Sequence, residues 1–116
     1  MTRKRIDGHS TEFGLWLREQ KQIDSSLGFV ATNLDYVWKN FKTGDWMLIE
    51  EKRFSGKVTF SQRKLFTHLH KSIQDKKYHG IHLITFENTS PEDGKIYLDN
   101  REITKDELLR FLSFSL

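Results

Sequence analysis

The feature that most constrains this chain is an apolar run that ends in charged residues. Residues Trp46–Ile49 have the composition of a buried strand, yet Glu50, Glu51 and Lys52 follow at once. Burying an unpaired charge costs several kcal/mol, so such residues are usually paired or hold a metal ion. Side chains alternate along a strand, which puts Glu50 and Lys52 on one face, about 6.6 Å apart. We therefore expect a strand over residues 46–53 with a polar site at its end.

A second acid, Asp35, stands fifteen residues before Glu50 in the strand-like run 34–38. Turn-forming residues at 42–45 separate the two runs and predict a hairpin between them. On adjacent strands, Asp35 and Glu50 can share a divalent cation, with Lys52 beside both. Mg²⁺ prefers oxygen ligands and keeps several waters, so two or three carboxylates are sufficient.

Length and composition narrow the class of protein. A chain of 116 residues fits one domain, expected over residues 1–116, and 36% hydrophobic residues suffice for a globular core. The absence of cysteine excludes a disulfide scaffold, a thiol nucleophile and a Cys-ligated zinc site. No apolar run approaches the roughly 20 residues of a membrane span, and the basic N-terminus lacks a signal-peptide core. We expect a soluble, cytoplasmic protein that makes no membrane contact.

Positive charge is concentrated after the acidic cluster. The segment Lys52–Lys77 holds eight basic residues and one acid, a net charge of +7, whereas the whole chain carries +3. A phosphate-backbone track beside a metal site requires such a segment, although a solvated lysine-rich helix produces the same pattern. The candidates for phosphate contacts are Arg53, Lys57, Arg63 and Lys64.

Hydrophobic periodicity and turn residues predict the remaining elements. Capping-box patterns begin at Thr59 and Thr104, each ahead of a helical run. The elements expected besides the central strand are a helix over 10–21, strands over 29–31 and 34–38, a helix over 61–76, a strand over 81–86, a hairpin over 95–103 and a helix from 104. The fold class is α/β, or α+β with a mixed sheet.

This element order, combined with Asp35 and the Glu50-x-Lys52 motif, resembles the PD-(D/E)xK nuclease superfamily. The resemblance covers Thr11–Phe86 and implies an αβββαβ restriction-endonuclease-like core over about residues 10–87. A C-terminal hairpin and helix over 95–116 would extend it. The sequence departs from the family motif at Asn33-Leu34, where a proline usually stands near the aspartate.

The resemblance also implies roles for individual residues. Asp35 and Glu50 would bind Mg²⁺, or Mn²⁺ in its place, and Glu51 would add its backbone carbonyl. Lys52 would position or help deprotonate the attacking water. Small Holliday-junction resolvases and virus-type replication-repair nucleases often add a glutamate on the first helix and a glutamine on the helix after the lysine. These correspond to Glu12, with Glu19 as the second choice, and to Gln62.

The expected function is a stand-alone, divalent-metal-dependent DNA endonuclease that is structure-selective or has low sequence specificity. A homodimer would allow one site to act on each strand. The alternatives are a non-catalytic nucleic-acid-binding module with the same fold and an RNA-processing nuclease. Each candidate residue also has a purely structural interpretation. Glu50 and Lys52 could form a chance surface ion pair, Gln62 could only cap its helix, and Glu12 could be a solvated acid on a helix.

Overall fold

The computed structural model describes residues 12–116 and divides the chain into two compact units, Met1–Thr32 and Asn33–Leu116. In the first unit, α1 (Glu12–Glu19) buries Leu15 and is followed by two 3₁₀ turns, η1 (Lys21–Ile23) and η2 (Ser25–Leu27). Residues 10 and 11 of the helix expected over 10–21 lie outside the described residues. The single domain expected over residues 1–116 stays a prediction.

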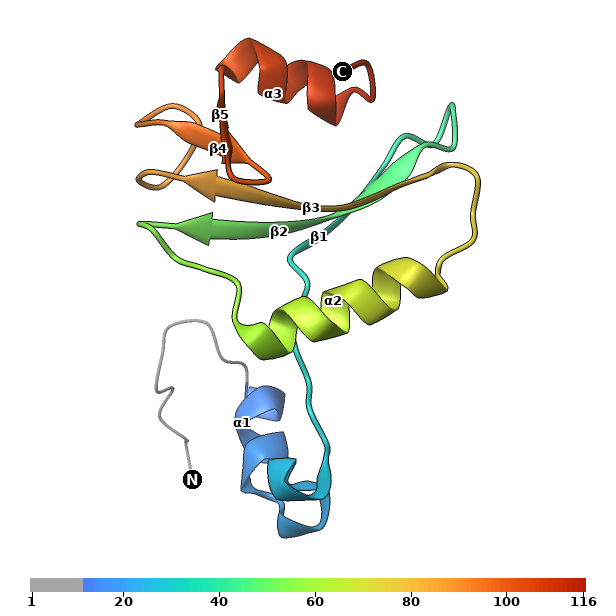
Figure 1. The fold of residues 1–116 in the computed structure, drawn as a ribbon, viewed down its shortest axis with the longest axis vertical. Helices are drawn as coiled ribbons and strands as arrows, with labels where there is room; N and C mark the ends of the chain where they lie inside the picture. Colours follow the sequence, from blue (N-terminus) through green and yellow to red (C-terminus); the bar gives the residue numbers. More distant parts are fainter. Residues whose placement is uncertain (1–11) are drawn as a thin grey trace. The chain divides into compact units, whose positions relative to one another are not determined.

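The second unit is a five-stranded mixed sheet with the strand order β1-β2-β3-β4-β5 (Figure 1). Its strands are β1 (Tyr36–Lys39), β2 (Trp46–Arg53), β3 (Tyr78–Phe86), β4 (Ile96–Leu98) and β5 (Arg101–Ile103). Only β2 and β3 are parallel, and every other neighbouring pair is antiparallel. A parallel pair needs a crossover connection, which α2 (Phe60–Ser72) supplies. The expected mixed α/β class is confirmed.

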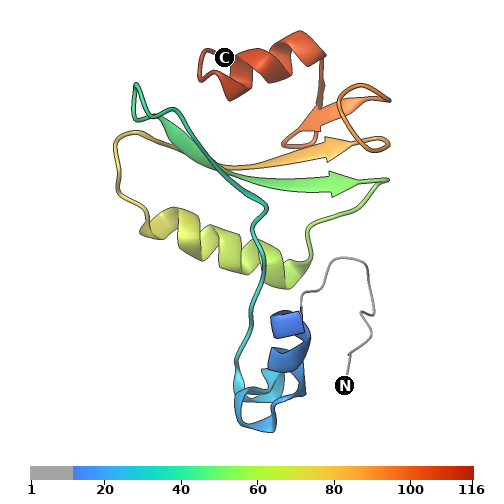
Figure 2. The same ribbon diagram turned by 180° about the vertical axis from the view of Figure 1, so that it is seen from behind.

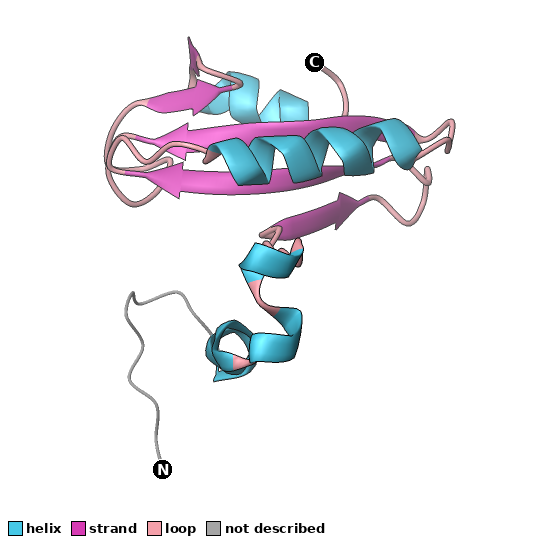
Figure 3. Ribbon diagram, turned by 60° about the horizontal axis from the view of Figure 1, so that its bottom comes forward, coloured by secondary structure: helices cyan, strands magenta, loops and turns pink. Residues whose placement is uncertain are grey.

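The two helices of this unit lie on opposite faces of the sheet, α2 on one and α3 (Lys105–Leu112) on the other (Figures 1 and 2). Figure 3 shows α2 running across β2 and β3. The buried core lies on the α3 face and consists of Met47, Ile49, Ile84, Ile96 and Leu108. Because side chains alternate along β2, Glu50 and Lys52 point to the α2 face.

Both predicted capping boxes are confirmed. Thr59 accepts a hydrogen bond from the Gln62 backbone and Gln62 bonds back to the Thr59 backbone, while Thr104 and Glu107 do the same for α3. The helix α2 ends at Ser72, earlier than the expected Lys76. None of the helices within residues 12–116 has the length and apolar composition needed to cross a membrane.

The strand expected over residues 29–31 is wrong, so two strands rather than three precede α2 in the described part of the chain. Phe29 and Val30 are 55% and 58% exposed, and the described residues of the first unit contain no strand with which they could form a ladder. The specific αβββαβ core therefore stays a prediction. β3 also begins at Tyr78 instead of Ile81, because a bulge opposite Met47 extends its pairing with β2.

Removing the Met47 side chain tests this core. Met47 is fully buried, so Met47→Ala should lower the free energy of unfolding by about 2–5 kcal/mol in urea denaturation. Phe41 is 91% exposed, and Phe41→Ala should change the same quantity by less than about 0.5 kcal/mol. Equal effects of the two variants would contradict the described packing.

Candidate active site

Strand β2 carries a carboxylate into the protein interior. This residue, Glu50, is only 4% exposed. Its Oε2 lies 3.4 Å from Nζ of Lys52, two residues further along the same face. Its Oε1 is buried and has no hydrogen-bond partner among the described residues. The predicted same-face pairing of Glu50 and Lys52 is confirmed, and one carboxylate oxygen is left unsatisfied.

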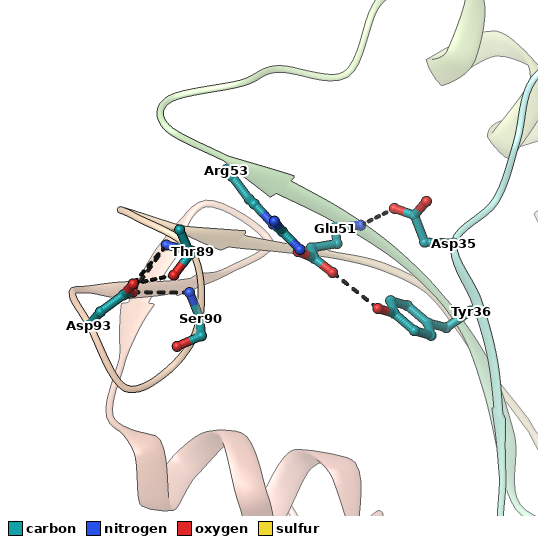
Figure 4. A network of polar contacts seen from close by, with 7 residues as sticks. All are labelled: Asp35, Tyr36, Glu51, Arg53, Thr89, Ser90 and Asp93. Carbon is teal, nitrogen blue, oxygen red and sulfur yellow. Dashed lines mark hydrogen bonds and ion pairs between the residues drawn. The ribbon is translucent and has the colours of Figure 1, made fainter. Parts of the chain in front are cut away.

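Asp35, the residue just before β1, lies next to this site. The pairing of β1 with β2 ends at Tyr36 opposite Ile49. Beyond that point, Oδ2 of Asp35 accepts a hydrogen bond of 2.8 Å from the backbone N–H of Glu51 (Figure 4). The Asp35 side chain thus binds a backbone N–H of β2 that no longer pairs with β1. This bond holds the exposed carboxylate of Asp35 next to the buried carboxylate of Glu50.

The two carboxylates strongly affect each other. Burial raises the pKa of Glu50, the neighbouring Asp35 carboxylate raises it further, and Lys52 opposes both, so that the pKa reaches about 7. When both carboxylates are ionised, neither can donate a hydrogen bond to the other. Only a shared proton or a bound cation satisfies both, which gives this pair an affinity for positive charge.

Lys52 is held between the strand and helix α2. Its Nζ donates a hydrogen bond of 3.4 Å to Oε1 of Gln62, and its side chain is 21% exposed. The same oxygen of Gln62 accepts from the backbone N–H of Thr59 at 3.2 Å. Gln62 therefore serves as helix cap and as a partner of Lys52 at once, so the two interpretations of this residue are compatible.

The Glu51 side chain lies on the opposite face of β2 from Glu50 and Lys52. Its Oε2 is 2.6 Å from Nε of Arg53, and its Oε1 accepts a hydrogen bond of 3.2 Å from the Tyr36 hydroxyl (Figure 4). This bond is the main cause of the raised pKa of Tyr36. Since the side chain is engaged here, Glu51 can contribute only its main chain on the Asp35 side. The contact of Tyr36 with Glu51 was not predicted from the sequence, although Tyr36 directly follows the candidate aspartate Asp35.

A divalent cation fits the oxygens that this site presents. Within residues 12–116, no group of three or more His, Cys, Asp and Glu side chains is placed to hold a metal ion. The site instead brings together two carboxylates, of which Glu50 keeps a buried oxygen without a partner. Mg²⁺ accepts such a small set because it retains several waters. The candidate ligands Glu12 and Glu19 lie on α1 in the first unit, so their part in this site stays a prediction.

The four basic candidates lie on the connection that leaves the site. Arg53 ends β2, Lys57 lies in the following loop, and Arg63 and Lys64 lie in the first turns of α2; all four are exposed. Arg53 is already paired with Glu51, and Lys64 places its Nζ 4.9 Å from the centre of the Phe60 ring. Positive charge therefore follows directly after the carboxylates along the chain.

Comparisons of this chain with protein-family models, curated proteins and solved structures find no match.

The raised pKa of Glu50 predicts a pH dependence of stability in metal-free buffer with EDTA. Between pH 4.5 and about 7 the folded state binds more protons than the unfolded state. The free energy of unfolding therefore falls as the pH rises through this window, by up to about 3 kcal/mol. Glu50→Gln should remove this fall and be the more stable protein at pH 8, as measured by urea denaturation.

The matched control is Glu92→Gln, which alters a side chain that is 71% exposed and paired with Lys105. This variant should keep the pH dependence of the wild-type protein. A Glu50→Gln protein that still loses stability over the same pH range would show that another group causes the effect.

Proposed function

We propose that this chain is a divalent-metal-dependent endonuclease of the PD-(D/E)xK kind that hydrolyses DNA phosphodiester bonds. The observation that carries the proposal is the unpartnered, buried Oε1 of Glu50 beside the carboxylate of Asp35, with Nζ of Lys52 3.4 Å from the other oxygen of Glu50. A carboxylate oxygen that is kept buried without a donor is costly in a protein that needs only a stable fold.

Asp35 and Glu50 would hold the cation, assisted by the main-chain carbonyl of Glu51. When bound, Mg²⁺ would supply positive charge that offsets the negative charge developing on the phosphate. The hydrogen bond from the Glu51 backbone to Asp35 orients the exposed carboxylate before any ligand arrives. Such preorganisation avoids the cost of reorienting the group during the reaction.

Lys52 would act on the phosphate and on the attacking water. Glu50 and Gln62 hold its ammonium group from two sides, yet the side chain stays partly exposed. In this position, the group can donate hydrogen bonds to a phosphate oxygen and orient a water molecule for attack. The basic residues 53, 57, 63 and 64 would bind flanking phosphates, which sets affinity without selecting a sequence.

A non-catalytic nucleic-acid-binding module with the same fold is the main alternative. A binding surface gains from exposed lysines and arginines but gains nothing from Glu50, whose buried negative charge opposes phosphate. The retained acid therefore favours the enzyme. The charge pattern suits DNA and RNA equally, so a structured RNA belongs among the substrates tested.

Plasmid nicking tests the proposed activity. Supercoiled DNA should be nicked with Mg²⁺ or Mn²⁺ and left intact with EDTA. Lys52→Ala and Glu50→Gln should each lower the rate by at least about a hundred-fold, because each removes a group that acts in the transition state. The control Lys42→Ala changes an exposed lysine in the β1–β2 turn and should retain the wild-type rate.

Equal activity in Lys52→Ala and the wild-type protein would contradict the proposal. Binding of DNA without cleavage in either metal would favour the non-catalytic module, and cleavage of RNA alone would favour the RNA-processing nuclease.

Metal binding should also be detectable without any substrate. At pH 8, Mg²⁺ at ten times its dissociation constant should stabilise the fold by about 1.4 kcal/mol, measured as a rise in Tm. Glu50→Gln should abolish this rise, whereas Glu92→Gln should keep it. An equal rise in Glu50→Gln would place the cation elsewhere on the protein.

A further inference from the structure

The connection from β2 to α2 begins with a strained turn next to the candidate site. The N–H of Gly56 donates to the carbonyl of Arg53 at 2.9 Å, closing a turn whose central residues are Phe54 and Ser55. Their φ angles are 52° and 65°, in the left-handed region that glycine, asparagine and aspartate usually occupy in such turns. For a bulky side chain this conformation is strained.

Burial of the Phe54 side chain does not offset this strain, because Phe54 is 63% exposed. Its backbone is nevertheless anchored, since the N–H of Phe54 donates to the carbonyl of Phe86 on β3 at 3.2 Å. Gly56 packs so closely that a Cβ at this position would lie 3.0 Å from the carbonyl oxygen of Arg53. The turn is thus fixed in place while it presents an aromatic side chain to solvent, two residues after Lys52.

A second exposed phenylalanine lies at the other end of the same connection. Phe60 is 72% exposed and is the first residue of α2, two residues before Gln62, which accepts from Lys52. The ammonium group of Lys64 lies 4.9 Å from the centre of its ring. Two exposed aromatic rings therefore flank the candidate site along the chain, each within two residues of a side chain of that site.

Exposed rings interleaved with cations match the chemistry of a nucleic-acid strand. Phosphates attract the basic residues 53, 57, 63 and 64, and the faces of all four bases can stack on aromatic side chains. In a duplex these faces are covered by neighbouring base pairs. Stacking beside the scissile phosphate therefore requires bases that are already unpaired or easily unstacked.

We propose that Phe54 and Phe60 stack on unpaired bases next to the scissile phosphate, so that the preferred substrate is a nucleic acid with single-stranded or distorted segments. This inference rests on the proposed function and specifies its substrate class. Phe54 and Phe60 are specificity-determining residues, separate from the groups that act on the phosphate.

The test compares three substrates of one sequence: a matched duplex, the same duplex with a central bubble, and the single strand. With Mg²⁺, the wild-type protein should cut the bubble at its unpaired bases with a kcat/KM at least about ten-fold above that of the matched duplex. Phe54→Asn and Phe60→Ala should each lower kcat/KM on the bubble by about ten-fold and leave cleavage of the matched duplex unchanged.

Phe54→Asn is the sharper variant because asparagine tolerates the left-handed conformation. It removes the ring while keeping the turn, and its Tm should equal or exceed that of the wild-type protein. Phe41→Ala is the control: it removes an exposed ring in the turn that precedes β2, at the far end of that strand from Lys52. This control should retain the preference for the bubble.

Binding is measured separately with Glu50→Gln, which is expected to bind DNA without cutting it. A 2-aminopurine placed among the unpaired bases should lose fluorescence on binding through stacking, and adding Phe54→Asn should restore it. Equal cutting of bubble and duplex, or quenching that is unaffected by Phe54→Asn, would overturn the inference. If no substrate is cut, the proposed function fails, and the fluorescence result still decides whether the rings stack on bases.

Discussion

The second unit depends on the pairing of β2 with a partner on each side. Antiparallel pairing with β1 and parallel pairing with β3 enclose its apolar residues Met47–Ile49, all of which are buried. The parallel pair requires a crossover, and this requirement places α2 on one face of the sheet. The core with α3 then forms on the other face. The polar residues at the end of β2 come to lie just beyond the last residue pair with β1, where β2 is still paired with β3.

Two features at or next to the candidate site are unfavourable for the stability of the fold. Glu50 keeps a buried oxygen without a partner, and its pKa is raised to about 7 by burial and by Asp35. Phe54 adopts a left-handed conformation with its side chain in solvent. A buried carboxylate oxygen without a partner and a strained, exposed aromatic residue are both unfavourable for the isolated fold. Their occurrence within five residues of each other is the pattern expected of a site whose ligand compensates these costs.

Sequence patterns predicted those features that depend on neighbouring residues. Alternation along β2 placed Glu50 and Lys52 on one face, and the capping boxes at Thr59 and Thr104 marked the starts of α2 and α3 correctly. The predictions that failed depend on which strands pair with each other. Residues 29–31 have the composition of a strand but no strand to pair with, and the early start of β3 depends on a bulge opposite Met47 that has no signal in hydrophobicity.

The chain's local order of apolar and charged residues was enough to specify an acid and a lysine at the end of a buried strand, because alternation is a property of the strand alone. Their chemical state was decided by tertiary structure. Asp35 approaches Glu50 only because pairing of β1 stops at Tyr36 and its carboxylate binds the next free N–H of β2. Burial and a neighbouring charge then raise the pKa of Glu50, and both arise from residues that folding brings together over distances no local pattern encodes.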